Sequence, residues 1–251
     1  MKDTHAHLMD ACYTEDIDEV IKNAISIGVT RILLIALDIE EYKMAYKLKE
    51  SYKIFDIGLG YHPSYVNELN NNWYEELEEY ISNDNILCVG EIGLDYHWDK
   101  DNKDKQKNVF RKQIELAIKY DKAIVVHSRD AMEDTINILK EYPEAKGIIH
   151  CFSGSKESAK ILVDMGYYIS VGGPLTFKNA ASLLEVFKSI PLNRLLLETD
   201  CPYLTPHPFR GKRNEPKFIE YTYNRAAELL EVDLDYLDEV INNNYKELFN
   251  K

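Results

Sequence analysis

The feature that most constrains the fold is a regular alternation of short apolar runs and longer amphipathic stretches along the 251-residue chain. Short runs rich in β-branched residues are typical of buried strands, and amphipathic stretches with a period near 3.6 residues are typical of surface helices. The predicted strands span residues 2–5, 31–36, 55–60, 87–92, 123–127, 147–150, 168–171 and 195–199. The predicted helices span residues 16–27, 40–51, 73–82, 105–120, 131–141, 156–165 and 180–189, with two more near 218–230 and 234–249.

About eight strand–helix units joined by short connections predict an α/β protein, a single (β/α)₈ TIM barrel with extra C-terminal helices that occupies residues 1–251 as one domain. A doubly wound open sheet is the alternative, but it requires a glycine-rich phosphate loop after the first strand, and none is present. Few residues precede His5, so we expect a short and frayed first strand.

The chain is acidic, with a net charge of −13 and a pI near 5.0. This charge argues against a broad basic surface for nucleic acid or anionic membrane, but it allows a local nucleic-acid site. The four cysteines form no C-x-x-C pair, which predicts reduced thiols. No apolar run reaches the length of a membrane span, and the N-terminus lacks the apolar core of a signal peptide. We therefore expect a cytoplasmic monomer with no membrane partner.

Ionisable side chains end five of the eight predicted strands. His5 and His7 are two residues apart, so a strand ending there would point both imidazoles the same way. Catalytic groups of α/β barrels come from the C-terminal ends of several strands. The other such side chains are Glu91, His127, His150 and Asp200. Each has an ordinary structural explanation when taken alone, but together at equivalent positions they indicate a metal site, because inward-facing charges need a compensating cation.

Six ligands exceed the needs of one four- or five-coordinate ion. They suit two divalent ions bridged by a carboxylate and a water, and Glu91 is the natural bridge because it lies between the first strand and the fifth and sixth. An all-carboxylate site would favour Mg²⁺ alone. Four histidines make Zn²⁺, Mn²⁺, Fe²⁺ or Ni²⁺ at least equally suitable, so Mg²⁺, Mn²⁺ and Zn²⁺ lead the candidates.

Several motifs in order along the whole chain resemble the TatD family of metal-dependent deoxyribonucleases and hydrolases, within the amidohydrolase-like barrels. The motifs are residues 3–8 (DTHAHL), 60–63 (GYHP), 90–96 (GEIGLDY), 126–129 (VHSR), 149–154 (IHCFSG) and 197–203 (LETDCPY). The resemblance implies a first metal held by His5, His7, Glu91 and Asp200, and a second held by Glu91, His127 and His150. It also implies hydrolysis of DNA or RNA phosphodiesters, usually from the 3′ end of single strands, and a role in DNA repair.

Other residues have supporting roles in this hypothesis. Asp3 and Glu198 share the strand parity of His5 and Asp200, so both should point into the barrel below the metals and accept an N–H from a ligand histidine. His62 lies after the third strand, where substrate contact and loop packing are equally good explanations. Asp95 is interpreted as a loop-stabilising side chain.

Two loops of the expected catalytic face have open interpretations. Residues 96–98 (YHW) could stack a nucleobase or anchor their loop, and the anchoring interpretation is slightly preferred. After the last strand, Arg210, Lys212 and Arg213 form a concentrated positive segment. Loops there often hold phosphate, which predicts substrate contacts, whereas the alternative is salt bridges at the rim.

The expected reaction is hydrolysis by a water molecule that two metals acidify, with Asp200 as its general base and Glu91 as the shared ligand. A deacylase or amidohydrolase acting on a carbonyl, such as that of an aminoacyl-tRNA, is the main alternative. A non-catalytic metal-binding scaffold is the third, and a free carboxylate beside the ligands argues against it.

Overall fold

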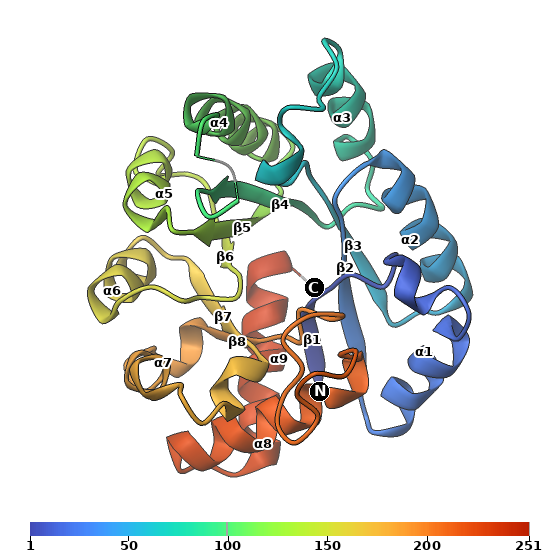
Figure 1. The fold of residues 1–251 in the computed structure, drawn as a ribbon, viewed down its shortest axis with the longest axis vertical. Coiled ribbons are helices and arrows are strands. Elements are labelled where there is room, and N and C mark those ends of the chain that lie inside the picture. Colours follow the sequence, from blue (N-terminus) through green and yellow to red (C-terminus); the bar gives the residue numbers. More distant parts are fainter. Residues whose placement is uncertain (99, 251) are drawn as a thin grey trace.

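The computed structural model describes residues 1–98 and 100–250 and is a (β/α)₈ barrel (Figure 1). Its eight parallel strands lie in chain order around the sheet. They are β1 (Lys2–Ala6), β2 (Arg31–Ala36), β3 (Phe55–Leu59), β4 (Cys88–Asp95), β5 (Ala123–Arg129), β6 (Gly147–Ile149), β7 (Tyr168–Val171) and β8 (Leu195–Leu197). Between β1 and β8 the barrel is closed by a bridge from Ala6 to Cys201 and by backbone hydrogen bonds just beyond β8.

Helices alternate with the strands and cover the outside of the barrel (Figure 1). They are α1 (Ile17–Ser26), α2 (Ile39–Ser51), α3 (Trp73–Ile81), α4 (Lys103–Lys119), α5 (Met132–Leu139), α6 (Lys156–Asp164), α7 (Ala181–Phe187), α8 (Ile219–Leu230) and α9 (Leu234–Phe249). Short 3₁₀ turns η1 (Ala11–Tyr13), η2 (Pro63–Tyr65), η3 (Gly173–Thr176), η4 (Leu192–Arg194) and η5 (Pro216–Phe218) lie in the connections. The predicted fold and element order are confirmed, and no described helix is both long and apolar enough to cross a membrane.

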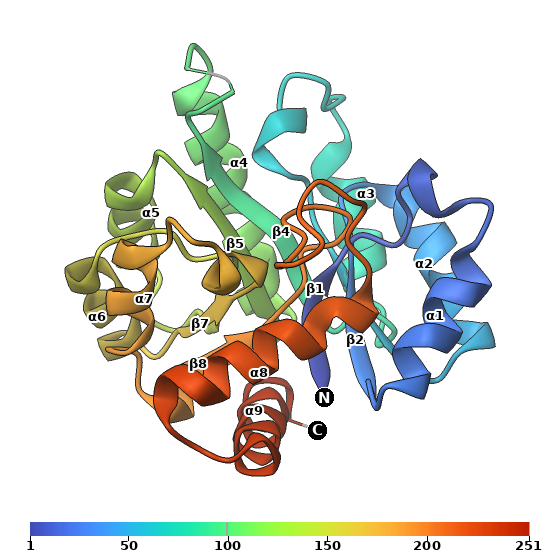
Figure 2. The same cartoon turned by 60° about the horizontal axis from the view of Figure 1, so that its bottom comes forward.

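The amino-terminal end of the barrel is covered by α9 (Figure 2). Asn244 donates hydrogen bonds to the carbonyls of Leu192 and Leu195 at the start of β8. The hydroxyl of Tyr245 donates to Asp56 at the start of β3. This end is therefore packed shut, and the carboxyl ends of the strands form the other end of the barrel, which Figure 1 views from outside.

The expectation of a frayed first strand is wrong. All five residues of β1 are buried, and the strand pairs with β2. The terminal ammonium of Met1 donates to the carbonyl of Gly28 at 2.7 Å and lies 3.2 Å from Asp238. The Tyr223 hydroxyl bonds both backbone groups of Lys2. Contacts from distant parts of the chain thus hold the start of β1 in place.

Candidate metal centre

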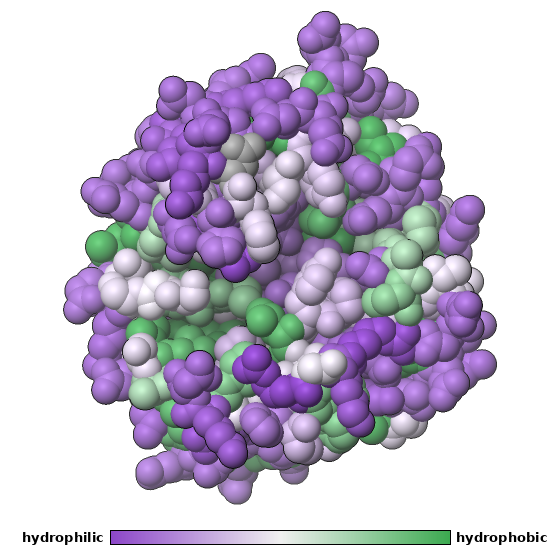
Figure 3. All heavy atoms as spheres, viewed as in Figure 1, coloured by the Kyte–Doolittle hydropathy of each residue, from purple (hydrophilic) through white to green (hydrophobic). Residues whose placement is uncertain are grey.

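The six predicted ligands converge at the carboxyl ends of the strands. The face of the molecule seen in Figure 3 is hollowed near its middle, with hydrophilic residues above the hollow and a hydrophobic area at its lower left. The ligands are supplied by β1, β4 and β5 and by residues shortly after β1, β6 and β8. His5, His7, Asp200, Glu91 and His150 are buried, and His127 is partly exposed.

Glu91 divides the centre into two halves, because its two oxygens face different histidines. Oε2 lies 3.2 Å from Nε2 of His5 and 3.6 Å from Nε2 of His7. Oε1 lies 2.7 Å from Nδ1 of His127 and 2.7 Å from Nε2 of His150. Asp200 Oδ1 completes the first half, 3.9 Å from His5 and 3.6 Å from His7.

The separations between the histidine nitrogens of each half fit divalent cations. A tetrahedral ion with bonds of 2.0–2.1 Å to nitrogen places its ligand atoms about 3.3 Å apart. Nitrogen atoms of His5 and His7 lie 3.0 Å apart, and those of His127 and His150 lie 3.3 Å apart. Imidazole and carboxylate together suit Zn²⁺, Mn²⁺, Fe²⁺ and Ni²⁺. The residues present therefore fit a metal in each half of the centre.

Partners behind the rings set which nitrogen of each histidine faces the centre. Nδ1 of His7 lies 3.2 Å from the carbonyl of Ile35, so it carries the hydrogen and leaves Nε2 to bind a cation. Nε2 of His127 lies 3.0 Å from Asp95, which leaves Nδ1 to face Glu91. This role of Asp95 was missed, because its partner is 32 residues away in the sequence.

The two carboxylates expected beneath the metals differ in their partners. Glu198 Oε1 lies 3.5 Å from Nδ1 of His150, which has no hydrogen-bond partner, and it accepts the backbone N–H of Cys151 at 2.7 Å, so the orienting role of Glu198 stays a prediction. Asp3 instead accepts hydrogen bonds from the backbone and hydroxyl of Thr199 and from the backbone N–H of His5. Burial raises the pKa of Asp3 to about 7, although these hydrogen bonds by themselves lower it. Asp3 thus links β1 to the residues that follow β8 through hydrogen bonds.

Charges within the centre keep its carboxylates ionised. Burial alone would raise the pKa of Glu91, but the imidazoles of His150 and His5 outweigh it and hold the pKa well below its usual range. Burial likewise opposes ionisation of Asp200, but the imidazoles of His7, His150 and His5 nearby lower its pKa overall. Both carboxylates are therefore negative at neutral pH, as ligands for cations must be.

His62 belongs to the centre. Its Nε2 lies 3.7 Å from Oε1 of Glu91, and its Nδ1 accepts the backbone N–H of Ser64 at 3.1 Å. Burial lowers the pKa of His62 to about 3, so the ring is neutral and carries its hydrogen on Nε2. Its N–H therefore points toward the space beside Glu91, where a substrate oxygen could accept it.

The basic segment after β8 is divided between two environments. Arg213 forms ion pairs with Asp16 at 2.6 Å and with Glu215 at 3.0 Å. For this residue the structure therefore shows the rim salt bridges that were the alternative to phosphate binding. Arg210 is exposed, with its guanidinium carbon 3.7 Å from the ring centre of Phe177. Lys212 is also exposed. Phosphate binding by all three stays a prediction, and for Arg213 it would require these pairs to break.

The aromatic residues after β4 also differ from one another. Tyr96 is buried, and its hydroxyl donates to Asp134 at 2.7 Å, so it anchors the loop as expected. Trp98 in contrast is 71% exposed.

The fold and the ligand cluster define a barrel hydrolase of the metal-dependent class, and comparisons with known proteins agree. The chain matches the family model described as "TatD related DNase" over residues 2–250. It is 44% identical over 249 residues to the "Uncharacterized metal-dependent hydrolase YabD" of Bacillus subtilis, covering 98% of each chain. It is 34% identical to the "Uncharacterized metal-dependent hydrolase YcfH" of Escherichia coli K12, covering 98% of this chain and 94% of that one.

A solved structure extends this likeness to three dimensions. The crystal structure of the TatD homologue YjjV from Escherichia coli K12 superposes with a TM-score of 0.94 at 30% identity, covering 100% of this chain and 98% of that one. The chain belongs to the TatD family and is a metal-dependent hydrolase.

Proposed function

We propose that this protein is a two-metal nuclease that hydrolyses phosphodiester bonds of single-stranded DNA from the 3′ end. Single-stranded RNA is proposed as a further substrate. The observation that carries the proposal is the position of Glu91 between two pairs of histidines. Each of its two carboxylate oxygens faces one pair, at distances of 2.7–3.6 Å. Paired metals bridged by a carboxylate are typical of enzymes that cleave phosphate esters by in-line attack. The family description, "TatD related DNase", supports the same substrate class.

His5, His7, Glu91 and Asp200 would hold one ion, and Glu91, His127 and His150 the other. When bound, such ions lower the pKa of a water molecule and neutralise negative charge on phosphate oxygens.

The chain's own groups supply the remaining chemistry. Asp200 turns one oxygen toward His5 and His7, which leaves its second oxygen to take the proton of the attacking water. His62 donates its Nε2–H to a phosphate oxygen, since its other nitrogen is occupied by Ser64. Arg210 and Lys212, exposed after β8, bind the phosphate backbone beyond the scissile bond.

The test is a release assay on end-labelled single-stranded DNA, RNA and acylated tRNA side by side, with the metal-loaded protein. We expect nucleotides to be released stepwise from the 3′ end of the single strands. Asp200→Asn should slow this by on the order of 10²–10⁴, as expected for loss of a general base. Rapid deacylation of tRNA with intact oligonucleotides would replace the proposal with the carbonyl hydrolase.

A further inference from the structure

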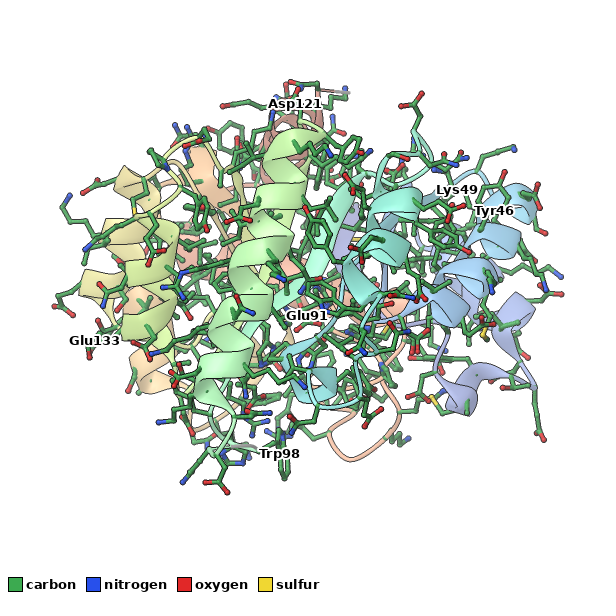
Figure 4. All side chains as sticks on the ribbon, turned by 90° about the horizontal axis from the view of Figure 1, so that it is seen from above. Tyr46, Lys49, Glu91, Trp98, Asp121 and Glu133 are labelled. Carbon is green, nitrogen blue, oxygen red and sulfur yellow. The ribbon has the colours of Figure 1, made fainter. Side chains whose placement is uncertain are left out.

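Trp98 is the most exposed large hydrophobic side chain among the described residues. It follows β4, the strand that carries Glu91, and so belongs to the loops around the metal centre. In the side view of Figure 4, Glu91 lies inside the barrel, and Trp98 lies at the outer edge of the molecule.

The turn that presents Trp98 is tied directly to the metal centre. Oδ1 of Asp95 accepts the backbone N–H groups of His97 at 2.9 Å and Trp98 at 3.2 Å. Oδ2 of the same carboxylate lies 3.0 Å from Nε2 of the ligand His127. The ring of His97 packs edge-on against the indole, with centroids 4.8 Å apart. One buried carboxylate therefore fixes the exposed indole relative to a metal ligand.

A positive charge lies beside the same indole. The guanidinium carbon of Arg129 is 5.3 Å from the centre of the Trp98 ring, a cation–π contact. Arg129 ends β5, two residues after His127, and it is exposed. Among residues 1–98 and 100–250 the structure records no carboxylate paired with Arg129. Its hydrogen-bond donors are thus available to an anion next to the metal centre.

We propose that Trp98 and Arg129 form a clamp for one nucleotide of the substrate, in which the base stacks on the indole and the adjoining phosphate binds the guanidinium. The inference rests on the proposed function and deepens it by naming how the site selects single strands. A base that is paired within a duplex cannot reach the indole. Every base has a π-face, so the clamp accepts any sequence. Arg129 binds phosphate oxygens as a fork of N–H donors.

Intrinsic fluorescence provides a test that does not depend on turnover. The chain has two tryptophans, so Trp73→Phe leaves Trp98 as the only indole. In an Asp200→Asn, Trp73→Phe background loaded with metal, a pentathymidylate should quench this fluorescence saturably. A pentamer of abasic sites with the same phosphates should quench it little. If a labelled pentathymidylate binds by anisotropy while the Trp98 emission stays constant, the clamp is wrong.

Kinetics separate stacking from a merely structural role. Trp98→Ala should lower kcat/KM for oligothymidylate about 5- to 150-fold, mainly through KM, because a stacked base contributes about 1–3 kcal/mol. Trp98→Phe should recover most of the loss, and Trp73→Phe is the matched control. Cleavage of the abasic strand should change less than twofold. An equal loss on both strands would overturn the proposal.

Arg129→Met tests the second half of the clamp. It should weaken binding of thymidylate and abasic strands alike and reduce the salt dependence of binding by up to about one unit of log–log slope. Arg225→Met, on the distant helix α8, is the charge-matched control. Unchanged affinity and slope in Arg129→Met would remove Arg129 from the clamp.

Failure of the clamp and failure of the nuclease proposal are distinguishable. If wild-type protein cleaves single strands but Trp98→Ala does so equally well, the clamp is wrong and the nuclease stands. If no strand is cleaved yet pentathymidylate still quenches Trp98, the clamp stands as a binding site and the nuclease proposal fails.

Discussion

At the scale of the residue, the metal centre depends on a single carboxylate shared between two groups of ligands. Glu91 is buried, and each of its oxygens lies within 2.7–3.6 Å of two imidazole nitrogens. In the proposed two-metal centre a carboxylate in this position would bind both cations, whereas a neutral amide of the same size offers only one weak ligand oxygen. The charge of Glu91 is therefore more important than its volume.

We predict that Glu91→Gln lowers the metal content from two ions per chain to one or fewer after dialysis against excess metal. Elemental analysis measures it directly. Glu157→Gln, an exposed substitution in the first turn of α6, controls for the loss of one negative charge. Two ions retained by Glu91→Gln would show that another ligand bridges them.

Asp95 gives a second prediction at this scale. It supports His127 from behind, and partners of this kind typically change metal affinity 10- to 100-fold. Asp95→Asn should therefore weaken the half of the centre formed by His127 and His150, as measured by metal titration, and leave the His5 half nearly unchanged. Asp130→Asn, on the exposed loop next to it, is the control. Equal weakening of both halves would point to general loss of the fold instead.

At the scale of the element, the junction between β1 and β8 places Asp200. The backbone N–H of Asp200 donates to the carbonyl of His5 at 3.0 Å, and that of His7 donates to the carbonyl of Cys201 at 2.8 Å. Asn214 fixes the chain beyond β8 through hydrogen bonds to the carbonyls of Thr199 at 2.9 Å and Tyr203 at 2.6 Å. The loop is thus folded against the barrel by one buried amide.

Asn214→Ala should destabilise the protein by about 1–3 kcal/mol, because it leaves the buried carbonyl of Thr199 without a donor, and the partly buried carbonyl of Tyr203 can turn to water instead. Urea unfolding at constant metal concentration measures this change in the free energy of unfolding. Asn224→Ala, exposed on α8, should cost less than about 0.5 kcal/mol. A loss below 1 kcal/mol for Asn214→Ala would mean that water replaces the amide.

The elements also show what the sequence could predict. Period and composition place all eight strands, because barrel strands are buried on both sides and read as apolar runs. The extension of β4 past Ile92 to Asp95 was not predicted, because it follows an irregular pairing near Gly90 that no local pattern marks. The sequence left a rim salt bridge of Arg213 open but could not name Asp16 as its partner, since the two are 197 residues apart.

At the scale of the whole molecule, the barrel has one closed and one open end. Helix α9 covers the amino-terminal end, so the residues at the carboxyl ends of the strands are free to form the site. The order of the strands and the alternation of side chains along each strand were enough to predict which ligands lie together at the carboxyl ends of the strands. The orientation of each ring was not predictable, because it depends on partners such as Ile35 and Ser64 in other loops.

The last prediction concerns metal removal from the entire barrel. Ligands from β1, β4, β5 and the ends of β6 and β8 meet at the centre, so a cation bound there cross-links distant parts of the chain only when the barrel is folded. Binding to the folded state alone adds about 2.7 kcal/mol for a site held at 100 times its Kd. For a chain of this size, each kcal/mol shifts Tm by about 2–4 °C. Chelation should therefore lower Tm by about 5–10 °C per site, and restoring the metal should reverse it.

The matched control is Glu91→Gln, for which the same chelator should produce a smaller shift because fewer ions remain to be removed. Calorimetry with parallel elemental analysis makes the comparison, since it links each Tm to a measured metal content. If the metal content falls to zero and Tm stays constant in the wild type, the unfolded chain would bind the ions as tightly as the folded one. Convergence of the ligands in the folded barrel, with His7 held by Ile35 and His127 by Asp95, would then give the ions no preference for the folded state.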